Sequence, residues 1–423
     1  MKITQLIGYQ VLDSRGRPTV AASVTLEDGT THAARVPSGA STGKHEAMEL
    51  RDGPGSSAKS FYGALSVSKA VDNVNTKSAP SIVGKPVDLH SIDRVIREID
   101  TSSNISTLGA NATLAVSLAS AKAAAHSQNV SLARFFQPKG NLLIPMPMVN
   151  ILSGGAHANR SLDFQDVLIV PTGASTFTEA LSWIVAVRET AAKLGSDMGM
   201  TTHLVADEGG LGLSFKSIDE AINFVLSAIN AVGLQIGSQV SIALDVASTQ
   251  FFQNGAYHLS SNKNSYSPEN FLSYIQRLVA NYPIISIEDP FAEDDWESWK
   301  SFTNGAPKEL QILGDDLLTT NSNRLEKAIE ESSANSILIK PNQNGLVSST
   351  HDVLKTAHKA GFKTVVSARS GETEDSWLAD LATGWRAGQI KVGSTHGSER
   401  NSKWNRLLEL EQIENVEFSK PFM

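Results

Sequence analysis

The sequence of 423 residues contains no cysteine, which excludes disulfide bonds, thiolate nucleophiles and cysteine-ligated zinc. It also has no excess of basic residues: 36 Lys and Arg face 44 Asp and Glu, giving a formal net charge of −8. No local Lys/Arg cluster offers a nucleic-acid surface. No apolar run approaches the roughly 20 residues that span a bilayer, and Met1–Gln10 lack a targeting pattern. We therefore expect a cytoplasmic, soluble protein without nucleic-acid or membrane partners.

The length exceeds what one hydrophobic core usually serves, so two domains are expected. Residues 3–35 alternate apolar and polar side chains between turn residues, a pattern typical of an antiparallel meander. Residues 62–74 and 110–128 are Ala-rich with apolar residues at helical spacing. Pro and Gly then interrupt the chain at 137–141, where a βα alternation begins. We predict an N-terminal α+β domain over 1–138 and a (β/α) barrel over 139–423.

The second half contains short apolar runs that each end in a charged residue. These charged residues are Asp245, Glu288, Asp315, Lys340, Arg369 and Lys391. The last five follow one another at intervals of 27, 25, 29 and 22 residues, each enough for one strand, one helix and two loops. In a parallel barrel the carboxyl ends of the strands meet on one face, so the six charges would share one mouth. Buried ion pairs or solvated rim charges are the alternative, but six charges in register favour a functional site.

The residue types at these strand ends indicate metal chemistry. Asp245, Glu288 and Asp315 offer carboxylate oxygens without cysteine or a close histidine pair, which favours Mg²⁺ over Zn²⁺. Lys340 would lie beside that metal. A nearby cation and partial burial both lower the pKa of a lysine, which would let Lys340 accept a proton from carbon. An ordinary ion-pair role for Lys340 remains the alternative.

Three further segments are candidates for the same mouth. Residues 207–210 (Asp-Glu-Gly-Gly) follow an apolar run and could be a simple turn, or could place an acid on another strand end opposite Lys340. His157 lies in a Gly-rich loop, where a lone histidine is more often solvated than catalytic. Residues 38–45 lack the Walker spacing and instead predict a Gly-hinged lid whose Ser41 could reach a metal or phosphate.

Short motifs in order along the chain carry a more specific pattern. They are Leu12–Thr19, Val36–Gly43, Glu49–Asp52, Leu108–Ala112, Gly154–Ala158, Asp207–Gly210, Ser286–Pro290, Glu293–Trp296, Gly314–Asp316, Leu338–Lys340, Arg369–Asp375 and Ser398–Arg400. In these motifs the chain resembles the enolase (phosphopyruvate hydratase) family over essentially its whole length. The resemblance implies Mg²⁺-dependent removal of water from 2-phosphoglycerate, a small phosphorylated three-carbon acid, as in glycolysis. It also implies a homodimer.

The resemblance implies a role for each site residue. Asp245, Glu288 and Asp315 would hold the first Mg²⁺, with Ser41 at a second. Lys340 would be the general base and Glu208 the general acid. The residues around the substrate would be His157, Asp166, Arg369, Ser370 and Lys391.

The chain departs from the family pattern at the phosphoryl end of the site. Ala368 stands where the family has a histidine that approaches the phosphoryl group, and Asp166 stands where it has a glutamate. The metal ligands and the base are retained. The departures leave two alternatives open: a paralogue that dehydrates an extended phosphonate or carboxyphosphonate substrate in phosphonate natural-product biosynthesis, and a noncatalytic binding or structural descendant.

Overall fold

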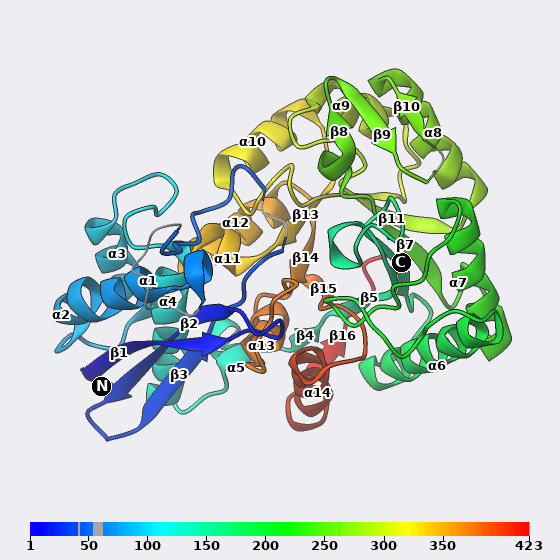
Figure 1. Cartoon of the computed structure of the whole chain (residues 1–423). Helices are drawn as coiled ribbons and strands as arrows, with labels where there is room; N and C mark the ends of the chain where they lie inside the picture. Colours follow the sequence, from blue (N-terminus) through cyan, green and yellow to red (C-terminus); the bar gives the residue numbers. More distant parts are fainter. Residues whose placement is uncertain (41–42, 54–61, 262, 423) are drawn as a thin grey trace.

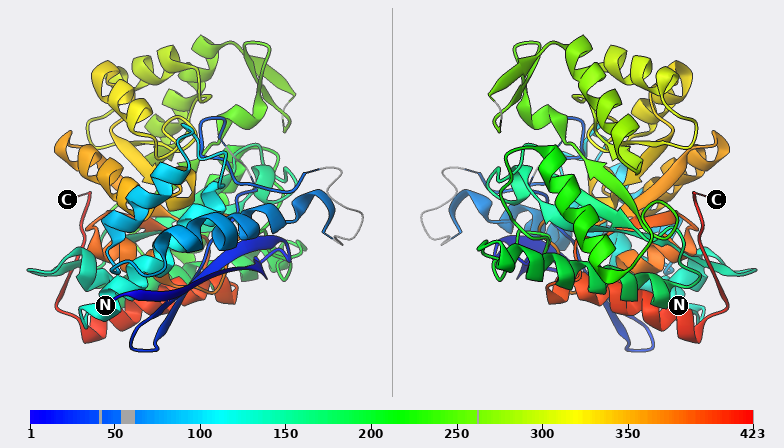
Figure 2. Two further views of the ribbon diagram at one scale, coloured as in Figure 1. Left: turned by 90° about the vertical axis from the view of Figure 1, so that its left-hand side faces the viewer. Right: turned by 90° about the vertical axis from the view of Figure 1, so that its right-hand side faces the viewer.

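The computed structural model describes residues 1–40, 43–53, 62–261 and 263–422, and shows a small sheet-and-helix unit beside a closed barrel (Figure 1). Ser41, predicted at a second metal, lies outside these residues. Two further views place the N-terminal unit on one side of the barrel (Figure 2). In the described part of the chain, no helix combines the length and apolar character needed to cross a membrane.

The N-terminal unit confirms the predicted meander. Strands β1 (Ile3–Leu12), β2 (Pro18–Leu26) and β3 (Thr31–Arg35) form an antiparallel sheet in that order. Helix α4 (Ala110–Ser127) packs on this sheet and is buried on nearly all sides, because its many alanines let neighbouring elements approach closely. The helix predicted over 62–74 begins only at Ser68 in the structure, as α1 (Ser68–Asn73), and continues without a break into η2 (Val74–Ser78) and α2 (Ala79–Ile82). The remaining elements of the unit are η1 (Gly63–Leu65), α3 (Leu89–Ile99) and α5 (Leu132–Phe136).

Eight strands close the barrel in the order β11, β12, β13, β14, β15, β5, β6, β7. Their bounds are β5 (Met146–Ser153), β6 (Asp166–Val170), β7 (Ser241–Asp245), β11 (Ile284–Glu288), β12 (Gln311–Gly314), β13 (Ser336–Ile339), β14 (Lys363–Ser367) and β15 (Gly388–Lys391). Strand β6 pairs antiparallel with both neighbours, so the expectation of a wholly parallel barrel is wrong at this strand. Residues 154–165 hold only η3 (Gly155–His157), and a parallel return needs a longer crossover. The reversal puts the first residue of β6 at the mouth.

The barrel interior is a separate apolar core. Met146, Met148, Leu168, Val170, Ala243, Leu313, Leu338 and Val365 pack there, and where one strand contributes two of them they are two positions apart. Helices cover the outside: α6 (Phe177–Asp197), α7 (Ile218–Val232), α8 (Pro268–Asn281), α9 (Trp296–Gly305), α10 (Ser322–Glu331), α12 (Val347–Lys359), α13 (Trp377–Gly384) and α14 (Ser398–Ile413).

Two small sheets complete the fold. β16 (Val416–Phe418) pairs in parallel with β4 (Leu142–Ile144), so the end of the chain returns to the segment where the barrel half begins. β8 (Phe252–Gln253), β9 (Ala256–Leu259) and β10 (Asn264–Tyr266) form a second sheet. The N-terminal unit is joined to the barrel half by polar contacts, including a partly buried one from Lys122 Nζ to Asp375 Oδ1 at 2.6 Å. The division between residues 138 and 139 stays a prediction.

Candidate active site at the barrel mouth

The six charged residues predicted at strand ends lie at one end of the barrel. Asp245 and Glu288 end β7 and β11 and are paired in register. Lys391 ends β15 beside β14, and Arg369 follows β14 by two residues. Asp315 and Lys340 directly follow β12 and β13. The ladder register of adjacent strands therefore brings these side chains together.

Two lysines form ion pairs with the three carboxylates. Lys391 Nζ lies 2.7 Å from Asp245 Oδ2 and 2.7 Å from Glu288 Oε2, and Lys340 Nζ lies 2.5 Å from Asp315 Oδ2. Burial, followed by repulsion from Asp245, raises the pKa of Glu288 well above its usual range. The site thus holds more buried negative charge than an isolated ion pair.

The environment of Lys340 differs from the prediction. Burial alone would lower the pKa of this lysine, but the adjacent carboxylate of Asp315 outweighs it, and the pKa is raised. Burial likewise favours the neutral form of Asp315, yet Lys340 lowers the pKa of that carboxyl. Among the protein's own groups, Lys340 is therefore a protonated ion-pair partner. It can act as a base only when the charge of Asp315 is engaged elsewhere.

Two glutamines orient the carboxylates and were missed by the sequence reasoning. Gln165 Nε2 donates to Asp245 Oδ2 at 3.0 Å, and Gln343 Nε2 donates to Asp315 Oδ1 at 2.9 Å. Gln165 precedes Asp166, and Gln343 lies on the short helix α11 (Pro341–Asn344). Glutamine is a common polar residue, and neither side chain was given a role from the sequence.

Behind Asp315 lies a second acidic residue, Asp289, which was also not predicted. Its carboxylate accepts the backbone N–H groups of Asp315 at 2.9 Å and Asp316 at 2.7 Å, which fixes the turn after β12. Burial and repulsion from Asp315 raise the pKa of Asp316 to about 8. Asp289, Asp315 and Asp316 have ligand atoms within 4.8 Å of one another.

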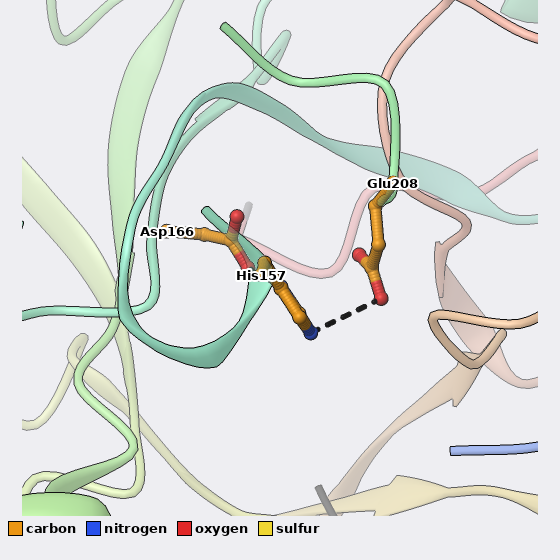
Figure 3. Close-up of side chains that lie close together, drawn as sticks. All are labelled: His157, Asp166 and Glu208. Carbon is orange, nitrogen blue, oxygen red and sulfur yellow. Dashed lines mark ion pairs between the residues drawn. The ribbon is translucent and has the colours of Figure 1, made fainter. Parts of the chain in front are cut away.

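Three residues from different segments form a buried cluster across the mouth: His157, Asp166 and Glu208 (Figure 3). His157 Nδ1 lies 3.3 Å from Asp166 Oδ2, and His157 Nε2 lies 3.6 Å from Glu208 Oε1. His157 is 7% exposed, so it is not the solvated loop histidine that its sequence context favoured. Glu208 is in the long loop between α6 and α7 and not at a strand end, because residues 203–210 make only isolated bridges before the Gly-Gly turn.

The proton of this cluster resides on the histidine. Burial would lower the pKa of His157, but Glu208 and Asp166 raise it to about 9. Burial would raise the pKa of Glu208, but the charge of His157 lowers it. Hydrogen bonds fix both acids, since Ser153 Oγ donates to Asp166 Oδ1 at 2.6 Å and Asn150 Nδ2 donates to Glu208 Oε2 at 3.2 Å. Burial raises the pKa of Asp166 even though the charge of His157 lowers it, so Glu208 is the more strongly ionised partner of the His157 imidazolium.

The remaining predicted residues, Arg369 and Ser370, line a cavity at the barrel mouth together with Lys340, His157 and Glu208. This cavity is small, with room of about 20 Å³, and it is lined by His157, Gln165, Glu208, Lys340, Ser367, Ala368, Arg369, Ser370 and Lys391. The guanidinium of Arg369 donates to both oxygens of Glu46, at 2.9 and 3.2 Å, a contact that the sequence did not reveal. Ser370 Oγ accepts the N–H of Ala40 at 2.6 Å. Ala368 contributes only a methyl group to this end of the cavity.

Two family models cover nearly the whole chain. Residues 3–136 match the model described as "Enolase, N-terminal domain". Residues 141–418 match the model described as "Enolase, C-terminal TIM barrel domain". Both matches agree with the sheet-and-helix unit and the closed barrel of the structure.

Proposed function

The chain belongs to the enolase family, and on that premise we propose that it is a magnesium-dependent hydro-lyase that converts 2-phosphoglycerate to phosphoenolpyruvate. The observation that carries the proposal is the composition of one cavity. Lys340, the His157–Glu208 pair and the Arg369–Ser370 segment all line it. Proton removal, hydroxide departure and binding of an anionic group each need one of these parts.

The donor set suits a divalent cation by its chemistry, but the three carboxylates are not among the described groups whose ligand atoms lie within 4.8 Å of one another, so their side chains would have to draw together around the ion. Asp245, Glu288 and Asp315 are buried carboxylates whose mutual repulsion contributes to the raised pKa of Glu288. Hard oxygen ligands of this kind suit Mg²⁺. When bound, Mg²⁺ supplies positive charge that stabilises negative charge developing on a substrate carboxylate. We assign these three residues as its ligands, and Ser41 stays the predicted residue for a second ion.

We assign the role of base to Lys340 and the role of acid to Glu208, which both line the cavity. Lys340 would remove the C2 proton once Asp315 no longer stabilises its ammonium form, since their ion pair raises the pKa of the lysine. Glu208 would assist departure of the C3 hydroxide. Because the pKa of His157 is raised to about 9, the proton that Glu208 delivers would come from its pair with His157.

The other residues of the cavity would hold the substrate. Arg369 and Ser370 would bind the phosphoryl group, and Arg369 can give two parallel hydrogen bonds to such an anion. Lys391 and Asp166 would lie beside the carboxylate and the reacting carbons.

A second substrate class is supported by Ala368. Its methyl group lines the cavity where a larger donor is absent, so a substrate extended at phosphorus could use the space. We favour 2-phosphoglycerate over a phosphonate substrate, because Arg369 and Ser370, which would bind its phosphoryl group, are still present beside Ala368. A noncatalytic role is the least supported, since the proposed base Lys340, the proposed acid Glu208 and the Arg369–Ser370 segment line one cavity. Family membership also supports a homodimer and a cytoplasmic location as proposals.

The proposal is tested with purified protein, Mg²⁺ and 2-phosphoglycerate, followed at the enol absorbance of the product. Wild-type turnover is expected, and Glu208→Gln should slow dehydration by about 10²–10³-fold while C2 proton exchange with D₂O persists. Absence of both turnover and exchange would contradict the proposal. Exchange only with an extended phosphonate analogue would favour the second substrate class.

A further inference from the structure

Arg400, on the first turn of α14, is a fully buried arginine with 0% exposure. Its guanidinium donates to four backbone carbonyl oxygens. Nη1 donates to Arg369 O at 2.7 Å and Val392 O at 2.9 Å. Nη2 donates to Ser370 O at 2.6 Å and Asp207 O at 3.3 Å. One side chain therefore joins three loops that are far apart in sequence.

Each of these loops carries a residue of the proposed site. Asp207 precedes Glu208, Val392 follows Lys391, and Arg369 and Ser370 are bound directly. The loops also touch one another, since Ser394 N donates to Glu208 O at 2.8 Å. A Cβ on Gly393 would lie 2.6 Å from Glu208 O and 3.1 Å from Arg400 Cδ. The backbone here is packed too closely for the loops to shift independently.

We propose that Arg400 is a positioning residue that sets the place of Glu208 relative to the Arg369–Ser370 segment. The inference rests on the proposed function, in which these segments hold the acid and the phosphoryl group. A guanidinium presents five N–H donors in one rigid plane, which suits several carbonyls around its edge. A lysine ammonium is a point charge with three donors and cannot satisfy all four carbonyls.

The effect of the positive charge of Arg400 on Glu208 can be tested separately from the effect of its hydrogen bonds to the loops. Arg400 also contributes to the lowered pKa of Glu208, after burial and His157. Arg400→Lys keeps the positive charge and changes the hydrogen-bond geometry. The nearby Lys403 is itself fully buried, with its ammonium 3.1 Å from Glu372 Oε2, so this part of α14 accommodates a buried lysine.

The proposal predicts that an Arg400 variant loses more of its net dehydration than of its C2 proton exchange. Arg400 makes no hydrogen bond to the segment that carries Lys340, so with saturating 2-phosphoglycerate Arg400→Lys should lose much less of its C2 proton exchange in D₂O than of its net dehydration. Net dehydration, which needs Glu208 in place, should fall roughly 10- to 100-fold, since a misplacement of about 1 Å can cost that much. Arg400→Gln, which keeps two donors, should show the same difference if the lysine variant does not fold.

The matched control is Arg406→Lys on the same helix. Arg406 pairs with Asp380 at 2.8 Å and binds none of the site loops, so both reactions should stay within about 3-fold of wild type. Equal loss of exchange and dehydration in the Arg400 variants, or dehydration within 3-fold of wild type, would overturn the inference. Wild-type protein inactive in both assays would overturn the proposed function and the inference with it.

Discussion

The two halves of the site are held in place by different means. Asp245, Glu288, Asp315, Lys340 and Lys391 lie at strand ends, where the barrel register positions them. Glu208, Arg369 and Ser370 lie in loops, where hydrogen bonds from buried side chains position them, and His157 lies in a short turn, where ion pairs with Asp166 and Glu208 hold it. A sheet ladder spreads its stability over many bonds, whereas a loop depends on a few. We therefore expect mutations at strand ends to remove one chemical function cleanly, and mutations around the loops to alter geometry.

The largest expected effect is at a strand end. Lys340→Ala should slow exchange of the C2 proton by about 10²–10⁴-fold, because loss of a positioned base removes proton transfer itself. The measurement is exchange in D₂O followed by NMR, with Lys355→Ala, an exposed lysine on α12, as the control. Wild-type exchange in Lys340→Ala would show that the strand-end half does not carry the base.

In the loop half of the site, the charge of His157 should make the free energy of unfolding depend on pH. The pKa of His157 is raised from 6.5 to about 9, so the folded state binds this proton more tightly than the unfolded state. Its stabilisation is complete below pH 6.5 and is lost as the pH rises towards 9, by up to about 1.4 kcal/mol per pH unit. Urea unfolding of wild type and His157→Asn at several pH values measures this.

The expected result is a stability difference that shrinks across this interval. A difference independent of pH would mean that His157 is neutral in the folded protein. The His157–Glu208 pair would then not contain an imidazolium.

A smaller effect is expected at the phosphoryl end of the loop half. An imidazole hydrogen bond to a charged oxygen contributes about 1.5–3 kcal/mol, so Ala368→His should tighten binding of 2-phosphoglycerate by roughly 10- to 150-fold. Calorimetric titration measures this, with glycerate, which lacks the phosphoryl group, as the control ligand. Weaker binding of 2-phosphoglycerate by the variant would favour a cavity shaped for an extended substrate.

The smallest predicted effect concerns a single side-chain hydrogen bond between the paired ends of β5 and β6. Ser153→Ala removes the 2.6 Å bond to Asp166 Oδ1 and should lower kcat about 5- to 10-fold, equivalent to roughly 1 kcal/mol. Steady-state kinetics measures it. Ser153→Thr, which keeps the hydroxyl, should recover most of the rate, and an unchanged kcat in Ser153→Ala would show that the ladder positions Asp166 without help.

By itself the sequence determined the barrel half, the N-terminal meander and the strand-end charges, because strand period and interval length are local properties that survive in any folded context. It also marked Glu208 and Arg369 through motifs. Only the tertiary structure decided that β6 runs antiparallel, that Lys340 is protonated by its pairing with Asp315, and that Glu46 holds Arg369. These facts depend on which groups burial brings together, and segments as distant as Asp207 and Arg400 meet only when the chain has folded.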